Sequence, residues 1–308
     1  MDMLTVSHVS KRFGSREIIK DLSLCVKQNS IYGFIGQNGA GKTTTMKMIL
    51  GLCKAEGGEI YVNGELVAYG QTKTNAYIGY LPDVPEFYGY MTPKEYLDLC
   101  GSLTGLSKEK RTKKVPELLN LVGLEQADKR IHGFSRGMKQ RLGIAQALIN
   151  EPKLLICDEP TSALDPVGRK EILSILERVK DHTTVIFSTH ILSDVERICD
   201  TIGLLHKGSL VFESSMDEIR HGGIHNTHND GFVFEFFDAP SAMKFMGTLQ
   251  KAGRAVRMDG QTRVICEDKE EKVYWQAMKM MEEQKILPMK AECMEPTLES
   301  LFMEVVGE

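Results

Sequence analysis

The residues with the most specific chemistry lie between Gly36 and Thr43, where the chain reads Gly-Gln-Asn-Gly-Ala-Gly-Lys-Thr. This spacing matches G-x-x-x-x-G-K-[ST], a loop that binds phosphate groups. Its glycines let successive backbone N–H groups point inward, and the helix that follows adds its positive N-terminal end. We expect Lys42 to reach the β- and γ-phosphates of a nucleotide and the Thr43 hydroxyl to hold Mg²⁺. The residues predicted to line the nucleotide phosphates are Gly36, Asn38, Gly39, Ala40, Gly41, Lys42, Thr43 and Thr44.

Side chains that could act on a bound nucleotide follow apolar runs elsewhere in the chain. Residues 153–157 form a strand-like run that ends in Asp158 and Glu159. An aspartate there can hold Mg²⁺, and the next carboxylate can polarise an attacking water. His190 ends a similar run and could bond a γ-phosphate oxygen, although a lone histidine at a strand end is usually structural. Phe13 ends the first strand-like segment, and its ring could stack on adenine or belong to the core.

The elements around the phosphate loop have the order that the motif needs. Residues 31–35 form a short apolar strand, and residues 44–50 follow the apolar spacing of a helix. Thr92, with proline and glutamate after it, indicates a capped helix start. Further helices are predicted over residues 93–103, 108–122 and 136–150, and a further strand over residues 76–81.

The composition is that of a packed protein without a global preference for nucleic acid. The 308 residues are 42% hydrophobic and 26% charged, with a formal net charge of −4, so one large or two ordinary domains are expected. The seven cysteines form no C-x-x-C pair, which favours a reduced cytosol and argues against structural zinc. The chain begins directly with a strand-like segment, so no signal peptide is expected. No apolar run approaches the length of a membrane-spanning helix, so a membrane role needs a separate partner.

The last quarter of the chain has a different organisation. Residues 223–231 are polar and glycine-containing, which predicts a linker, and a solvated linker is a better interpretation of its histidines than a metal site. Residues 232–308 follow a β-α-β-β-α-β order, typical of a ferredoxin-like domain, with a last helix over residues 297–306. No catalytic constellation is found in this region, which favours a lid, dimer-contact or regulatory role.

Several further motifs resemble, in their order along the chain, those of ATP-binding cassette (ABC) ATPases. The stretch from Phe134 to Met138 is similar to the family's L-S-G-G-Q signature, residues 162–165 to its D-loop, and residues 188–190 to its switch histidine. Phe13 matches the aromatic residue that stacks on adenine. These ordered matches span residues 1 to about 218, whereas the phosphate loop alone would also fit a GTPase or a kinase.

The resemblance implies an α/β fold: a P-loop ABC cassette over residues 1–222 with a mixed β core, an antiparallel β subdomain and a helical signature subdomain. The small C-terminal α+β ferredoxin-like domain would follow the linker. Two copies would face head to tail, with ATP between the phosphate loop of one and Ser135 and Gly137 of the other. Glu159 would be the general base, His190 would stabilise the transferring phosphate, and Asp165 would couple the two sites.

This sequence departs from the family pattern at a few positions. Arg136 and Met138 replace a glycine and a glutamine of the signature. Asp83 stands where the family's lid loop has a nucleotide-contacting glutamine. Because aspartate is shorter and acidic, Asp83 could contact Mg²⁺ through water.

Residues 135–145 together with the tail resemble the ATPase subunits of ABC-2-type exporters. This implies ATP and Mg²⁺ as ligands, an integral membrane permease as partner and a second ATPase subunit, a homodimer being favoured. It also implies a position at the cytoplasmic face of the cell membrane and no nucleic-acid partner. The alternative is a soluble ABC ATPase that acts on nucleic acid or ribosomes. Members of that class commonly carry two cassettes, a coiled coil or a zinc insertion, none of which this sequence shows.

Overall fold

The computed structural model describes residues 1–71, 73–220, 231–268, 270–293, 298–299 and 302. Backbone contacts divide the chain into two units, Met1–Met216 and Asp217–Glu308, and each is described by itself. Most of the linker predicted at 223–231 and most of the helix predicted at 297–306 lie outside the described residues. The predicted domain boundaries therefore stay predictions.

The larger sheet of unit 1 has six strands: β3 (Ile31–Ile35), β6 (Ile78–Leu81), β7 (Leu154–Asp158), β8 (Thr184–Thr189), β9 (Thr201–His206) and β10 (Ser209–Ser215). Their order is β10-β9-β3-β8-β7-β6, with β10 antiparallel to β9 and the others parallel. Every residue of β3, β7 and β8 is buried, which explains their continuous apolar runs. The strand predicted from Ala76 begins only at Ile78, because a 3-10 helix, η1 (Thr74–Tyr77), precedes it.

A second, antiparallel sheet contains β1 (Asp2–Phe13), β2 (Arg16–Lys27), β4 (Gly57–Val62) and β5 (Glu65–Leu66) in the order β2-β1-β4-β5. The tight turn between β4 and β5 is made by Asn63 and Gly64, whose φ angles are 50° and 78°. Asparagine and glycine tolerate such positive angles, so the turn forms where the sequence indicated it.

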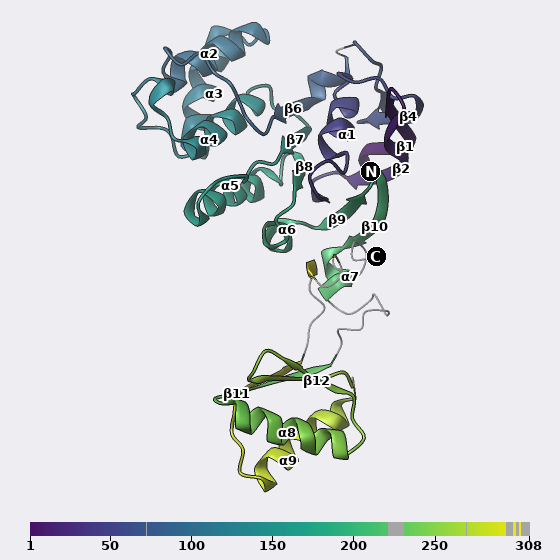
Figure 1. Ribbon diagram of the computed structural model, residues 1–308. Coiled ribbons are helices and arrows are strands. Elements are labelled where there is room, and N and C mark those ends of the chain that lie inside the picture. The colour runs from purple at the N-terminus through teal and green to yellow at the C-terminus, as the bar shows by residue number, and fades with distance from the viewer. Residues whose placement is uncertain (72, 221–230, 269, 294–297, 300–301, 303–308) are drawn as a thin grey trace. The chain divides into compact units, whose positions relative to one another are not determined.

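The helices α2 (Pro93–Leu103), α3 (Lys108–Leu121) and α4 (Arg136–Ala147) gather in a lobe beside the larger sheet (Figure 1). α2 has the predicted capping box, in which the Thr92 hydroxyl accepts from the Glu95 N–H and the Glu95 carboxylate accepts from the Thr92 N–H. The remaining described helical segments of unit 1 are α1 (Lys42–Ile49), η2 (Ile131–Gly133), α5 (Pro166–Val179) and α6 (Leu192–Ile198), and α7 (Met216–Arg220) begins at the last residue of this unit.

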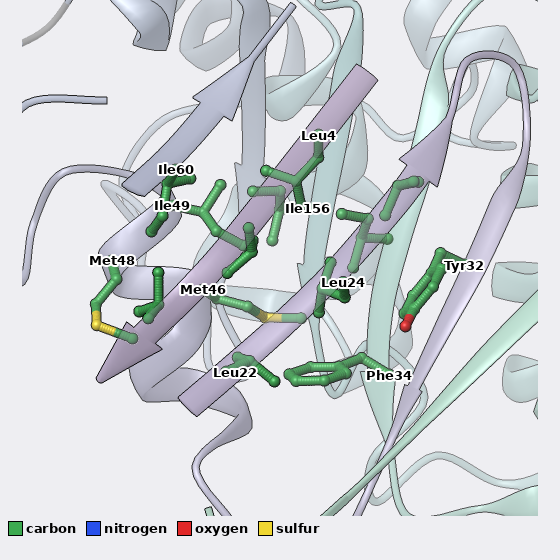
Figure 2. Close-up of a cluster of buried hydrophobic side chains, with 14 of the residues drawn as sticks. Leu4, Leu22, Leu24, Tyr32, Phe34, Met46, Met48, Ile49, Ile60 and Ile156 are labelled. Carbon is green, nitrogen blue, oxygen red and sulfur yellow. The ribbon is translucent and has the colours of Figure 1, made fainter. Parts of the chain in front are cut away.

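One buried cluster joins the two sheets and α1 (Figure 2). Met46 and Ile49 of α1 belong to it, together with Leu4 and Leu22 of the antiparallel sheet and Ile156 of β7. Burial of these side chains removes apolar surface from water and fixes α1 against both sheets. Because the phosphate loop leads directly into α1, this core also fixes the end of the loop.

The described residues of unit 2 include a four-stranded antiparallel sheet and two helices of 13 residues each. Its elements are β11 (Phe232–Phe236), α8 (Ala239–Lys251), β12 (Val256–Asp259), β13 (Arg263–Cys266), α9 (Glu271–Glu283) and β14 (Pro288–Cys293). The strands pair in the order β12-β13-β11-β14. Phe234 and Phe245 meet edge to face in the core, with ring centroids 5.2 Å apart. The β-α-β-β-α-β order predicted for the tail is thus present.

The core around α1 leads to a stability prediction. Met46 is 0% exposed, so Met46→Ala should lower the free energy of unfolding by about 2–5 kcal/mol through lost burial and a cavity. Urea unfolding followed by circular dichroism measures the loss. Leu103→Ala is the matched control, because Leu103 is 78% exposed, and it should change the value by less than about 0.5 kcal/mol. Equal effects of the two variants would contradict this account of the core.

Candidate functional site

The phosphate loop connects β3 to α1, and its glycines are required by the space and the backbone. Gly41 caps α1 with a φ of 115°, which other residues rarely adopt, and a Cβ there would lie 2.4 Å from Ile19 Cδ1. A Cβ on Gly36 would lie 2.5 Å from the carbonyl oxygen of Leu205. Ala40 is buried, Asn38 and Gly39 are exposed at the tip, and Thr44 lies half-buried in the first turn of α1.

Lys42 lies at the centre of the site although it carries a charge. Its side chain is 6% exposed, and its ammonium donates to the Gly36 carbonyl at 2.6 Å. The ammonium also forms an ion pair with Glu159 Oε1 at 3.1 Å. A buried charge needs such partners. The contact places the predicted phosphate clamp directly beside the predicted general base, so a phosphoryl group held by Lys42 would lie close to Glu159.

Asp158 links the loop to the sheet. The Thr43 hydroxyl donates to Asp158 Oδ2 at 2.7 Å, and the Ser188 hydroxyl donates to Asp158 Oδ1 at 2.6 Å. The pKa of the nearby Tyr80 hydroxyl is raised to about 12. Burial is the largest cause, and the negative charge of Asp158 and other nearby groups adds to it. The hydroxyl and carboxylate of Thr43 and Asp158 are the hard oxygen donors that Mg²⁺ prefers. The donor set therefore fits the predicted magnesium ion.

Glu159 follows Asp158 with a backbone φ of 48°, in the left-handed region that costs a non-glycine residue about 1–3 kcal/mol. Its N–H donates to the Ser188 hydroxyl at 3.0 Å and lies 3.2 Å from the Ser188 carbonyl oxygen. Its carboxylate Oε2 lies 2.9 Å from His190 Nδ1. The carboxylate of Glu159 thus lies between Lys42 and His190, and the structure brings these three predicted residues together.

Ser188 also lies in the site, although the sequence predicted no role for it. It is fully buried in β8, directly opposite Asp158 in the register of β7 and β8. One hydroxyl donates to Asp158 and accepts from the main chain of Glu159, so it orients both acidic residues. The only sequence signal was its position two residues before His190 at the end of an apolar run.

Three predicted residues lie at the starts of helices. The Ser135 hydroxyl accepts from the Met138 N–H and caps α4, and Asp165 Oδ1 accepts from the Gly168 N–H and caps α5. A Cβ on Gly137 would meet a Leu164 methyl at 3.8 Å, so Gly137 lies near the D-loop. Within the described part of the chain, no hydrogen bond or ion pair connects Ser135, Gly137 or Asp165 to Lys42 or its partners.

Asp83 contacts the helical lobe. Its carboxylate Oδ1 lies 3.3 Å from Arg136 Nη2, and its carbonyl accepts from Gln140 Nε2 at 2.7 Å. Two of the three residues that depart from the family pattern, Asp83 and Arg136, are therefore paired with each other. A cavity of about 490 Å³ lies beside them, lined by Asp83, Val84, Pro85, Glu86, Phe87, Gly89, Ile131, His132, Arg136, Lys139 and Gln140.

Phe13 is exposed at the end of β1. Its ring is 55% exposed, and the Lys11 ammonium lies 4.9 Å from the ring centroid. An exposed ring at a strand end can stack on a purine without competing with the core. Among the described residues, Phe13 does not belong to the buried cluster that joins the two sheets and α1. Among the described residues, no helix is long and apolar enough to cross a membrane.

Comparison with known proteins gives consistent relatives. The family model described as "ABC transporter" matches residues 19–162. The chain is 44% identical to the uncharacterized ABC transporter ATP-binding protein YxlF of Bacillus subtilis (strain 168), over 71% of this chain and 72% of that protein. It is 40% identical to the bacitracin transport ATP-binding protein BcrA of Bacillus licheniformis, over 71% of both. It is 36% identical to the lantibiotic transport ATP-binding protein SrtF of Streptococcus pyogenes, over 76% and 99%.

Solved structures share the fold. The ATP-binding subunit of an ABC transporter matches with a TM-score of 0.64 and 34% identity, over 72% of this chain and 93% of that chain. A dimeric ATP-binding cassette in a post-hydrolysis state, bound to ADP and Pi, matches with a TM-score of 0.63 and 26% identity, over 70% and 99%. The predicted cassette fold is thereby confirmed.

Ser188 gives the prediction of this section. Ser188→Ala removes the donor to Asp158 and one acceptor of the Glu159 N–H, so the rate of ATP hydrolysis should fall by roughly 10-fold or more. The Mg²⁺ concentration for half-maximal rate should rise, because Asp158 loses its orientation. Steady-state assays with varied Mg²⁺ measure both. The control is Ser30→Ala, which removes a serine hydroxyl that donates to the Lys27 carbonyl away from the site, and it should leave the two values unchanged.

Proposed function

The chain belongs to the ABC transporter ATP-binding proteins and is the ATP-hydrolysing subunit of a transporter, and we propose that it powers an ABC-2-type exporter. The proposed cargo class is peptide antibiotics or similar compounds. Relatives named for bacitracin and lantibiotic transport support this choice. They also favour transport over the alternative of a soluble ATPase acting on nucleic acid or ribosomes.

The observation that supports the proposed ATP hydrolysis is the contact of Glu159 with both Lys42 and His190. A carboxylate 3.1 Å from a phosphate-binding ammonium and 2.9 Å from a histidine is placed to act on a terminal phosphate. In the proposed reaction Glu159 accepts a proton from water as the water oxygen bonds to the γ-phosphorus. The bond to the bridging oxygen breaks, and ADP and phosphate are released. Lys42 and His190 stabilise the charge on the transferring group.

The residues that would hold Mg²⁺ are Thr43 and Asp158. A bound Mg²⁺ would neutralise part of the negative charge on the nucleotide phosphates. Phe13 would stack on the adenine, since its ring is exposed and a purine face needs no hydrogen bonds to bind there.

We propose that two copies of the chain form a head-to-tail homodimer around two ATP molecules. Ser135 and Gly137 begin α4, and the N-terminal end of a helix attracts phosphate. Since they have no described bond to their own phosphate loop, the ligand of this helix end would be the nucleotide of the other copy. The dimeric cassette among the structural matches supports the arrangement. Asp165 would then couple the two sites, and release of phosphate would let the copies separate.

A membrane permease would receive the movement. The lid loop from Asp83 to Tyr90 is the proposed contact, because the pairing of Asp83 with Arg136 ties this loop to the start of α4. The subunit would lie at the cytoplasmic face of the cell membrane, held there by the permease. Asp83 could still contact Mg²⁺ through water once it parts from Arg136.

The C-terminal domain is proposed to be ferredoxin-like and to have an accessory or regulatory role. The support is the strand order β12-β13-β11-β14, in which β13 lies between β11 and β12 and is antiparallel to both. The split β-α-β arrangement of that fold has the same pattern. We keep residues 1–222, 223–231 and 232–308 as the proposed cassette, linker and C-terminal domain.

The role of Glu159 as the general base can be tested by substitution. Glu159→Gln keeps the shape of the side chain but cannot accept the proton, so ATP turnover should fall at least ~100-fold while ATP affinity is retained. The variant should also accumulate an ATP-bound dimer, visible by size-exclusion chromatography. Near-normal hydrolysis by this variant would falsify the assignment of Glu159.

The second prediction tests whether each site is built from two chains. Lys42→Ala removes the phosphate clamp, and Ser135→Arg blocks the opposing half-site, so each variant alone should be inactive. Mixing them produces dimers in which one site carries both changes and the other carries none. ATPase activity should therefore return only on mixing, and two differently tagged chains allow mixed dimers to be counted. Full activity of Ser135→Arg alone would rule out the shared site.

A further inference from the structure

An ion pair between α5 and α6 lies one turn beyond two of the predicted site residues. Arg169 is in the first turns of α5, and its N–H donates to the carbonyl of Asp165 at 3.0 Å. Asp194 is in the first turn of α6, directly after the loop that carries His190. Arg169 Nη2 donates to Asp194 Oδ1 at 2.5 Å and to the Ser193 hydroxyl at 3.2 Å. The pair thus connects the helix starts that follow the D-loop and the switch histidine.

The pair is unusually buried for a charged contact. The Asp194 side chain is 4% exposed and that of Arg169 is 28% exposed. Removing such charges from water is expensive, and a buried ion pair is often no more stabilising than an apolar pair of the same volume. Stability alone is therefore a weak reason for placing these charges here.

Arg169 and Asp194 form fewer hydrogen bonds with each other than their side chains allow. Asp194 Oδ2 and Arg169 Nε are buried without a hydrogen-bond partner among the described residues. A guanidinium and a carboxylate can form two parallel bonds, and only the bond through Nη2 is made. A displacement of α5 against α6 that brought Nε to Oδ2 would complete the second bond. The pair therefore has unused bonding capacity for a second arrangement of α5 against α6.

We propose that Arg169 and Asp194 are positioning residues that fix the His190 loop relative to the Asp165 loop and thereby set the contact of His190 with Glu159. The inference rests on the proposed roles of Glu159, His190 and Asp165 in hydrolysis. A shift of Asp165 caused by the other copy moves the start of α5, and Arg169 passes it to Asp194 and the His190 loop. Neither residue is among those proposed to bind the nucleotide. Their effect is on the geometry of the reacting groups.

The test uses the full chain and compares Arg169→Met with the wild type. We expect kcat for ATP to fall by roughly 10- to 100-fold, since small displacements of reacting groups have effects of that size. The affinity for ATP, measured by equilibrium binding, should change less than about twofold, because the phosphate loop is untouched. Arg169→Lys keeps the charge without the planar fork and should recover part of kcat.

A matched control comes from another pair between two helices. Arg111 Nε lies 2.8 Å from Asp98 Oδ1, joins α3 to α2 and has a side chain 16% exposed. Like Arg169 it makes a second bond, here to the Leu106 carbonyl. Asp98 is 51% exposed and Asp194 only 4%, so Arg111→Met should lower the thermal midpoint less than Arg169→Met does, with kcat unchanged within about twofold.

A double variant separates positioning from folding. Arg169→Met with Asp194→Leu replaces both charges by apolar groups and should fold at least as well as the single variant. We expect its kcat to stay low although its thermal midpoint returns towards that of the wild type. Recovery of kcat together with the midpoint, or normal kcat in Arg169→Met, overturns the proposal. Loss of activity in Glu159→Gln alongside normal Arg169→Met would leave the proposed function standing and remove only this inference.

Discussion

The hydrogen bond between Thr43 and Asp158 is the contact on which the rest of the site depends. It joins the first turn of α1 to the carboxyl end of β7, two segments far apart in the sequence, at 2.7 Å. The contact is possible because β3, β8 and β7 are parallel neighbours, so their carboxyl ends meet at one edge. The buried cluster around Met46 holds α1 at that edge. Without this packing the phosphate loop and the acidic residues would be two unrelated polar segments.

Opposite charges lie close together at this edge of the sheet. Lys42 carries the positive charge, Asp158 and Glu159 carry the negative charges, and all three are largely buried. Low exposure strengthens each interaction and makes an unpaired group costly, so the side chains are held in fixed partnerships. The Ser188 hydroxyl donates to the Asp158 carboxylate and accepts from the main-chain N–H of Glu159. The pairing of β7 with β8 holds the backbone of Glu159 in its left-handed conformation. This conformation directs the Glu159 carboxylate towards His190.

Two helix caps have both a structural role and a proposed functional role. Ser135 and Asp165 satisfy the first N–H groups of α4 and α5, which any helix requires. The same helix starts are the surfaces that a second copy would meet in the proposed dimer. The ion pair of Arg169 with Asp194 then extends one of these helix starts to the His190 loop. Local folding requirements and the proposed communication between sites thus involve the same residues.

The amino-acid sequence determined the phosphate loop, the acidic pair after β7 and the capped start of α2, because each depends on local spacing and on the intrinsic chemistry of its residues. It also determined the β-α-β-β-α-β order of the tail, since apolar periodicity is a local property. The tertiary structure alone decided that Asp83 pairs with Arg136, that Ser188 orients Asp158 and Glu159, and that Arg169 meets Asp194. Each of these contacts depends on strand order, register or helix packing. Those features follow from the simultaneous burial of distant apolar segments, which no local pattern records.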